Sequence, residues 1–255
     1  MPDLIDELDA VLLEHEKRDK VNHYPSEASA CIRQTYYKWQ GYDPSNPIEA
    51  GAVWKMSMGN SIHKIVPDLL VRAGYEVEEE KEVIFEHKSL EYPVKGRIDI
   101  LFRRPDSVWE VMEVKSSYGR GILQTQQSGA PKQEHYDQLV MYLHMNDNDT
   151  GHLLYLGRDN AYRTVFTIHK DGETEHRFNN LLNRYAMVEH YLKEKKIPPR
   201  EFTASIVDGE IKNKFQCNKQ EYKGDWQCSY CAHNKKCWAD ILAQPGKFYG
   251  EERIA

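Results

Sequence analysis

The sequence lacks any long apolar run, and this absence limits where the protein can work. A membrane-spanning helix needs about 20 consecutive apolar residues, and no stretch of the 255 residues approaches that length. Residues 1–20 are acidic and amphipathic, without the basic start and apolar centre of a signal peptide. We therefore expect a cytoplasmic protein with no membrane partner.

An excess of basic residues is also absent, since the formal net charge is −6. Proteins that bind DNA non-specifically are often basic overall, so DNA binding here needs basic residues gathered at one place. We expect the acidic stretch 76–82 to face away from DNA. The basic residues expected around a single site are Lys95, Arg97, Arg103, Arg104, Lys115, Arg120 and Lys132. A solvated surface is the alternative for each of them.

The sequence has few cysteines, and their number is odd. The five cysteines are Cys31, Cys217, Cys228, Cys231 and Cys237. An odd count in a chain without secretion features argues against a disulfide framework. Three of them form a Cys-x2-Cys-x5-Cys pattern in a tail with little core, which predicts a bound metal. A fourth ligand is needed, and local spacing alone favours Cys217 over the distant Cys31.

Hydrophobic residues make up 40% of the chain, which is enough for a core, and the sequence has no internal repeat. Helical spacing of apolar residues predicts helices, and alternation predicts strands. The expected helices are 4–12, one capped by Ser26 that carries Cys31, Tyr36 and Tyr37, and 47–58, 59–73, 133–145 and 175–195. The expected strands are 77–85, 94–102, 108–114, 152–156 and 163–169, with a loop over 119–129. This order predicts an α/β fold with a mixed central sheet flanked by helices.

The chain is expected to divide into four segments. These are an N-terminal helix (1–25), a helical segment (26–75), a core that holds the sheet (76–197) and a cysteine-rich C-terminal segment (198–255).

Two neighbouring strands carry charged residues where a core strand is normally apolar. Asp99 interrupts the strand 94–102, whose Val94, Ile98, Ile100 and Phe102 are expected on one face. Glu113 and Lys115 are two apart on the next strand, so they point to the same side. A hairpin turn at 105–107 would bring Asp99 beside them.

Two carboxylates and a lysine suit phosphodiester hydrolysis. Carboxylates bind hard cations such as Mg²⁺ or Mn²⁺, which lower the pKa of bound water. A nearby lysine can orient that water or stabilise the transition state. The alternative is structural, with Asp99 as a turn residue and Glu113 with Lys115 as an exposed ion pair.

The pattern Gly96-Arg97-Ile98-Asp99 followed by Glu113-Val114-Lys115 resembles the PD-(D/E)XK nuclease superfamily. Gly59-Asn60-Ser61-Ile62-His63 and the pair Gln138 and Tyr142 resemble motifs of its RecB-like branch. The resemblance implies a restriction-endonuclease-like core in which His63, Asp99, Glu113 and the Val114 carbonyl bind Mg²⁺ or Mn²⁺. It also implies that Lys115 assists the attacking water and that Gln138 and Tyr142 position DNA or Lys115.

The cysteines resemble those of iron–sulfur nucleases in this branch, above all the CRISPR-associated (Cas) 5′-3′ exonuclease family and its virus-encoded relatives. That resemblance implies a [4Fe-4S] cluster on Cys31, Cys228, Cys231 and Cys237, with Cys217 spare. The cluster would form a C-terminal iron–sulfur subdomain and tie the two ends of the chain together. Zinc is the alternative metal, because four thiolates suit it equally well.

The function implied by the resemblance is a metal-dependent DNA exonuclease, acting on single-stranded DNA with 5′-3′ polarity. Its setting would be DNA processing, recombination or CRISPR spacer acquisition, and Arg97, Tyr118 and Arg120 are further candidates for DNA contact. Two alternatives stay open. One is a DNA-processing adaptor that works mainly through protein partners, with the acidic N-terminal helix as a docking element. The other is a catalytically inactive DNA-binding module.

Overall fold

The structure is a computed structural model that describes residues 3–14, 20–216 and 222–254. The chain divides into two compact units. The first contains the described residues of 1–15, 21–30 and 50–186. The second contains those of 16–20, 31–49 and 187–255. The four expected segments are a different division of the chain, which stays a prediction.

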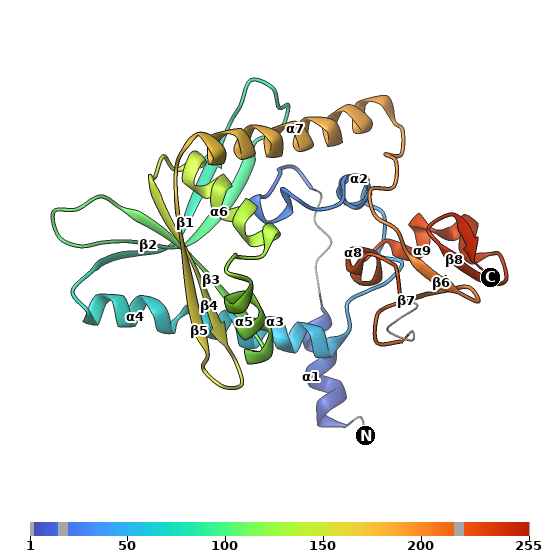
Figure 1. Cartoon of the computed structure of the whole chain (residues 1–255), viewed down its shortest axis with the longest axis horizontal. Helices are drawn as coiled ribbons and strands as arrows, with labels where there is room; N and C mark the ends of the chain where they lie inside the picture. Colours follow the sequence, from blue (N-terminus) through green and yellow to red (C-terminus); the bar gives the residue numbers. More distant parts are fainter. Residues whose placement is uncertain (1–2, 15–19, 217–221, 255) are drawn as a thin grey trace. The chain divides into compact units, whose positions relative to one another are not determined.

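A five-stranded mixed sheet is the centre of the first unit (Figure 1). Its strands, in spatial order, are β1 (Glu76–Phe85), β2 (Val94–Arg103), β3 (Glu110–Ser117), β4 (Thr150–Gly157) and β5 (Arg163–His169). Neighbouring strands are antiparallel except β3 and β4, which are parallel. The predicted mixed sheet is thus confirmed.

Helices cover both faces of this sheet, as predicted (Figure 1). On one face, α3 (Ala50–His63) and α4 (Ile65–Arg72) pack on Ile100 and Val114 through apolar residues such as Val66. On the other face, α5 (Gly119–Ser128) and α6 (Gln133–Met145) cover Leu101 and Leu153. The first part of α7 (Gly172–Glu194) packs over α6. The helix α1 (Leu4–Leu13) also belongs to this unit.

The expected loop over 119–129 is wrong, because the structure has the helix α5 there. Two glycines, a threonine and a serine lower the helix propensity of this stretch. Ile122 and Thr125 are nevertheless buried on one side of it, so tertiary packing outweighs propensity. Gly129, with φ of 68°, ends the helix in the left-handed region.

The two helices expected over 47–73 are present, but their boundary lies at Lys64 rather than at Gly59. Pro67 explains this boundary, because it has no N–H to bond to the His63 carbonyl four residues earlier. The break leaves His63 as the last residue of α3.

The helix expected from Ser26 through Tyr37 is wrong in its first half. A short 3-10 helix, η1 (Pro25–Glu27), is followed by α2 (Ile32–Trp39), and Cys31 is the residue before α2. The Ile32 N–H at the start of α2 donates to the Glu201 carboxylate at 2.6 Å. This partner is 169 residues away in the chain, so local sequence could not reveal it.

The second unit contains α2, the end of α7 and a small antiparallel sheet with the strand order β7-β6-β8-β9. The strands are β6 (Ser205–Val207), β7 (Glu210–Lys212), β8 (Lys247–Tyr249) and β9 (Glu252–Ile254). The helices are α8 (Trp226–Tyr230), α9 (Asn234–Cys237) and α10 (Ala239–Leu242). Their core is small and consists of Ala204, Ile206, Trp238, Ile241 and Phe248. Among the described residues, no helix is long and apolar enough to cross a bilayer.

Candidate active site

Asp99 lies where β2 and β3 stop pairing. Their ladder ends at Ile100 opposite Met112, and beyond it the Asp99 carboxylate accepts a hydrogen bond from the Val114 N–H at 2.8 Å. The side chain of Asp99 thus satisfies a backbone group next to the opened ladder, with 16% of its surface still exposed.

The alternation of β2 changes at Asp99, which corrects the expectation of one continuous apolar face. Val94 and Ile98 pack on the α6 side of the sheet, whereas Ile100 and Phe102 pack on the α4 side. On the neighbouring strand, Glu80 has φ of 51°, in the left-handed region that a residue with a side chain rarely adopts. This distortion accompanies the change of face and leaves the Asp99 carboxylate at the sheet surface.

Glu113 is buried, with 2% of its side chain exposed. Its Oε1 accepts hydrogen bonds from Lys115 Nζ at 2.5 Å and from Gln138 Nε2 at 2.8 Å. Lys115 also donates to the Gln138 side-chain oxygen at 2.9 Å. The second oxygen, Oε2, has no hydrogen-bond partner. A buried carboxylate oxygen without a donor is costly, and a cation would satisfy it.

The pKa of the Glu113 carboxyl is raised to about 7. Burial is the largest cause, and the nearby Asp99 carboxylate adds to it, while Lys115 opposes both. Metal-free Glu113 is therefore poised between its charged and neutral forms at neutral pH. A bound cation would favour the charged form.

Gln138 and Tyr142 lie one turn apart on α6, so they share a helix face. The Tyr142 hydroxyl donates to the Arg97 carbonyl of β2 at 2.9 Å. Gly96 permits this approach, because a Cβ at that position would lie 2.6 Å from the Tyr142 ring. The two side chains thus connect α6 to both strands that carry the carboxylates.

His63 approaches the same place from α3. Its Nδ1 lies 3.6 Å from Asp99 Oδ2, and 32% of its side chain is exposed. Close packing of α3 on β3 makes this possible, since a Cβ at Gly59 would lie 2.8 Å from the Ser116 hydroxyl. The structure therefore brings together all the residues expected at the site: His63, Asp99, Glu113, Val114, Lys115, Gln138 and Tyr142.

The unpartnered Glu113 oxygen and the neighbouring Asp99 carboxylate suit a divalent cation that prefers oxygen ligands, and His63, which lies near Asp99, could add a nitrogen ligand. Nevertheless, no group of three or more His, Cys, Asp or Glu side chains in the described residues is arranged to hold a metal ion. Lys115 already donates to Glu113, and His63 Nδ1 lies 3.6 Å from Asp99 Oδ2. Cation binding at this site therefore requires these side chains to move.

Some of the basic residues expected around the site lie next to the acidic stretch 76–82, whose expected orientation away from DNA stays a prediction. Because β1 pairs with β2, three of these basic residues form ion pairs with its glutamates. The pairs are Lys95 with Glu82, Arg97 with Glu80 and Arg103 with Glu76. The alternation of each strand alone did not reveal this pairing of opposite charges.

Tyr118 and Arg120 lie at the start of α5, directly after β3, and both are exposed. Arg158, which the sequence patterns did not single out, has its guanidinium carbon 5.3 Å from the centre of the Tyr118 ring. Its signal in the sequence was its position just after the strand expected over 152–156, which the structure pairs with β3. The parallel pairing of β3 and β4 makes such ends neighbours.

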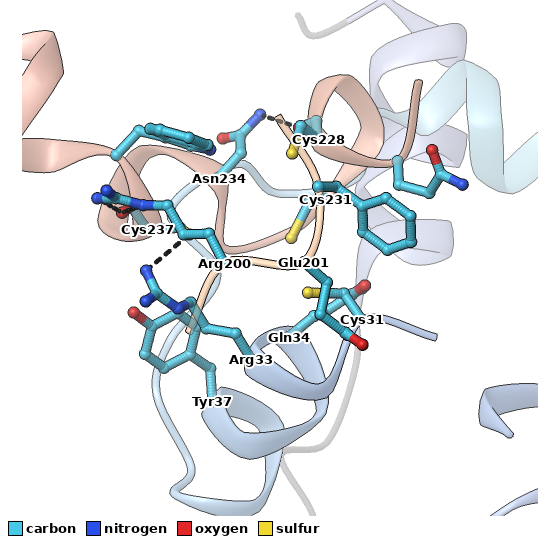
Figure 2. Close-up of a pocket in the computed structure, with 13 residues that line it drawn as sticks. Cys31, Arg33, Gln34, Tyr37, Arg200, Glu201, Cys228, Cys231, Asn234 and Cys237 are labelled. Carbon is cyan, nitrogen blue, oxygen red and sulfur yellow. Dashed lines mark hydrogen bonds between the residues drawn. The ribbon is translucent and has the colours of Figure 1, made fainter. Parts of the chain in front are cut away.

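Four cysteines line one cavity in the second unit (Figure 2). Cys31 lies before α2, and Cys228, Cys231 and Cys237 lie in or next to α8 and α9. Figure 2 shows the sulfurs of Cys31, Cys228 and Cys231 turned toward a common space. Cys217 lies outside the described residues.

The lining of this cavity mixes apolar and polar side chains, and its charged members are Arg33, Arg200 and Glu201. Burial raises the pKa of Cys228 to about 12 and that of Cys231 to about 11, and it also raises the pKa of Cys31. Without a metal these thiols are therefore protonated. Arg33 Nη1 approaches Cys237 Sγ at 3.5 Å, and Arg200 Nη2 donates to the Cys237 carbonyl at 2.6 Å. Positive charge here would stabilise thiolates that ligate a metal group.

Comparison with known proteins gives one family match. A model of the PD-(D/E)XK nuclease superfamily matches residues 10–238. No curated protein matches the sequence.

The chain is similar to several solved structures, among them the following three. The crystal structure of SSO0001 has a TM-score of 0.52 and 19% identity, over 91% of this chain and 95% of that one. The alkaline exonuclease LHK-Exo from Laribacter hongkongensis has a TM-score of 0.47 and 18% identity, over 74% and 97%. A phage-related exonuclease from Haemophilus somnus 129PT has a TM-score of 0.46 and 12% identity, over 74% and 99%. SSO0001 shares the fold, and the other two likenesses are weaker.

Proposed function

Since the chain belongs to the PD-(D/E)XK nuclease superfamily, we propose that it is a Mg²⁺- or Mn²⁺-dependent deoxyribonuclease. We further propose that it is an exonuclease that degrades single-stranded DNA with 5′-3′ polarity. One observation carries the proposal: the buried Glu113 carboxylate has an unpartnered oxygen beside Asp99, and Lys115 contacts its other oxygen.

Each residue of the site has a proposed role. His63, Asp99, Glu113 and the Val114 carbonyl would hold the cation, which supplies charge neutralisation and a more acidic bound water. Once Lys115 leaves Glu113, its ammonium group can donate to the attacking water or to a phosphate oxygen. Gln138 is hydrogen-bonded to both Lys115 and Glu113, so it would hold these two side chains in position.

The proposal is tested with single strands and duplexes labelled at either the 5′ or the 3′ end. We expect Mn²⁺ to start degradation of the single strand and EDTA to stop it. With 5′-3′ polarity, a 5′ label appears at once in mononucleotides or short products, whereas a 3′ label stays on progressively shorter strands. Internal cuts that accumulate from both labels would contradict the exonuclease assignment, and no cleavage with either metal would contradict the function.

We also propose a [4Fe-4S] cluster on Cys31, Cys228, Cys231 and Cys237, which would place the protein in the RecB-like iron–sulfur branch. The shared cavity and the two neighbouring arginines support it. The cluster would stabilise the second unit, whose apolar core is small. Zinc stays the alternative, because four thiolates accept either.

Anaerobic purification separates the two metals. A brown protein with broad visible absorption and about four iron atoms per chain, as [4Fe-4S] requires, supports the cluster. A colourless protein with one zinc per chain contradicts it. The setting, whether recombination, CRISPR spacer acquisition or other DNA processing, stays a prediction.

One observation favours a second candidate, an adaptor that works through a protein partner. None of the residues of α1 is buried, and its apolar side chains Leu4, Ile5 and Val11 are each more than half exposed. Deleting residues 1–14 separates the candidates. A nuclease would keep its rate on free DNA, whereas an adaptor would have no such rate to keep.

A further inference from the structure

Tyr118 leaves more than half of its surface in solvent, although it directly follows the strand that carries Glu113 and Lys115. Its exposed fraction is 53%. It comes immediately after β3, three residues beyond Lys115. Three residues of extended chain span about 10 Å. That reach suits a nucleotide next to the scissile phosphate rather than the phosphate itself.

Arg158 holds the ring of Tyr118 from one side. Its guanidinium carbon lies 5.3 Å from the ring centre. The arginine is itself fixed, because its backbone N–H donates to the Ser117 carbonyl at 2.9 Å and its Nη1 donates to the Lys55 carbonyl of α3. A ring held by a fixed cation loses little freedom when another planar group stacks on it.

The surface around this pair suits nucleic acid. Arg120 is exposed in the first turn of α5, and Tyr162, in the loop after β4, is 52% exposed. That loop lies against the start of α5, because the Gly119 N–H donates to the Asp159 carboxylate at 2.6 Å. The Asp159 carboxylate is thereby engaged by a backbone donor.

We infer that Tyr118, supported by Arg158, is a stacking platform for an unpaired base and so selects single strands for the site. The inference rests on the proposed nuclease function and deepens it. An aromatic ring can stack on any of the bases, but only on a base whose face is not already covered. In a duplex, both faces of an internal base are covered by its neighbours. Tyr118 is therefore a positioning residue rather than a catalytic one.

Binding is measured with the full chain in EDTA, where cleavage does not interfere. The probes are a fluorescent thymidine 20-mer and an abasic 20-mer with the same number of phosphates. The variants are Tyr118→Ala, Tyr118→Phe and the control Phe215→Ala. Phe215 is a matched control because it is also exposed, and Lys214 lies 5.1 Å from its ring centre. Thermal midpoints establish that each variant is folded.

We expect Tyr118→Ala to weaken binding of the thymidine strand by about tenfold, since stacking on one base gives that order of effect. Tyr118→Phe and Phe215→Ala should stay within about twofold of the parent, because stacking needs the ring and not the hydroxyl. The parent and Tyr118→Ala should bind the abasic strand with equal affinity. Such a difference between the two probes is not expected from a merely structural role.

Three results would overturn the inference: no effect of Tyr118→Ala, an equal loss on both probes, or no binding of single strands by the parent. Its failure is distinguishable from failure of the proposed function. A protein that cleaves DNA but shows no Tyr118 effect keeps the function and loses the platform. A protein that stacks the strand but never cleaves it keeps the platform and loses the function.

Discussion

At the scale of one residue, Glu113 has an unfavourable free energy of burial that a bound cation would reduce. Its carboxyl is buried, and only one of its oxygens is hydrogen-bonded. Metal-free protein therefore holds a charged group that it cannot fully satisfy. A buried polar group without a partner needs a physical explanation, and a cation that binds there is one.

We predict that Glu113→Gln makes the metal-free protein more stable above neutral pH. The folded pKa, about 7, exceeds the ordinary value of 4.5, so the unfolded chain binds fewer protons between these values. Wild-type stability consequently falls as the pH rises from 4.5 to 7, and the variant lacks this loss. At pH 8 in EDTA we expect a gain of roughly 1–3 kcal/mol, measured by urea unfolding. A variant less stable than wild type at pH 8 would contradict this.

His135 should make the opposite contribution to pH dependence. Burial, with Lys115 and Lys132 adding, lowers its pKa to about 3, and its Nδ1 lies 2.9 Å from the Tyr155 hydroxyl. Below pH 6.5 the unfolded histidine takes a proton that the folded one does not, so stability is lost as the pH falls. At pH 5 the loss is about 2 kcal/mol.

The variant His135→Gln is expected to reduce the loss of unfolding free energy between pH 7 and pH 5 by about this amount. The exposed His190 supplies the control His190→Gln. Equal pH slopes for wild type and His135→Gln would show that His135 has no such effect.

At the scale of elements, the contact of β2 with α6 positions the site. A Cβ atom added at Gly96 of β2 would lie 2.6 Å from the Tyr142 ring and 2.9 Å from the Pro25 side chain. We predict that Gly96→Ala destabilises the protein by about 1–3 kcal/mol through overpacking. In contrast, Gly51→Ala in α3, with nothing within 4 Å, should stabilise it by about 0.5–1 kcal/mol. Urea midpoints measure both, and equal midpoints would refute the packing argument.

Sequence patterns predicted the elements whose burial is regular. The helix over 133–145 and the strand over 163–169 have the expected bounds, because their apolar residues follow one period. The helix α5 and the start of α2 were missed. The first depends on tertiary packing of Ile122, and the second on the distant Glu201. The face change at Asp99 was also missed, since it accompanies a distortion of Glu80 on another strand.

The candidate site was better predicted than its surroundings. The spacing of Asp99, Glu113 and Lys115 specified two strands and one face, and the structure brings these side chains together. Arg158 and the ion pairs between β1 and β2 depend on which strands become neighbours. The alternation of apolar and polar residues within one strand does not indicate which strands will be its neighbours.

At the scale of the whole molecule, the described chain has two units with separate chemistry. The first holds the carboxylates and the second holds the four cysteines of the cavity. If the cluster stabilises only the second unit, losing the cluster should destabilise that unit and leave the first unit unchanged. In Cys231→Ser we expect amide hydrogen exchange to speed up by at least about tenfold in 198–254 and to stay unchanged in β2, β3 and α6.

Cys217→Ser is the matched control for that experiment, because Cys217 is the cysteine expected to be spare. It should exchange like the parent throughout. Faster exchange spread over both units in Cys231→Ser would show that the units do not unfold separately.

If Asp99 and Glu113 form a metal-dependent nuclease site, the rate of Mn²⁺-dependent cleavage of single-stranded DNA must depend on Asp99. The comparison is between wild type, Asp99→Asn and Asp149→Asn, the last a control at a carboxylate with 82% of its side chain exposed. We predict that Asp99→Asn lowers the rate at least about 100-fold with an unchanged thermal midpoint. Asp149→Asn should stay within about twofold of wild type, because an exposed carboxylate away from the cation contributes little. Wild type that cleaves nothing, or Asp99→Asn that cleaves as fast as wild type, would contradict this assignment.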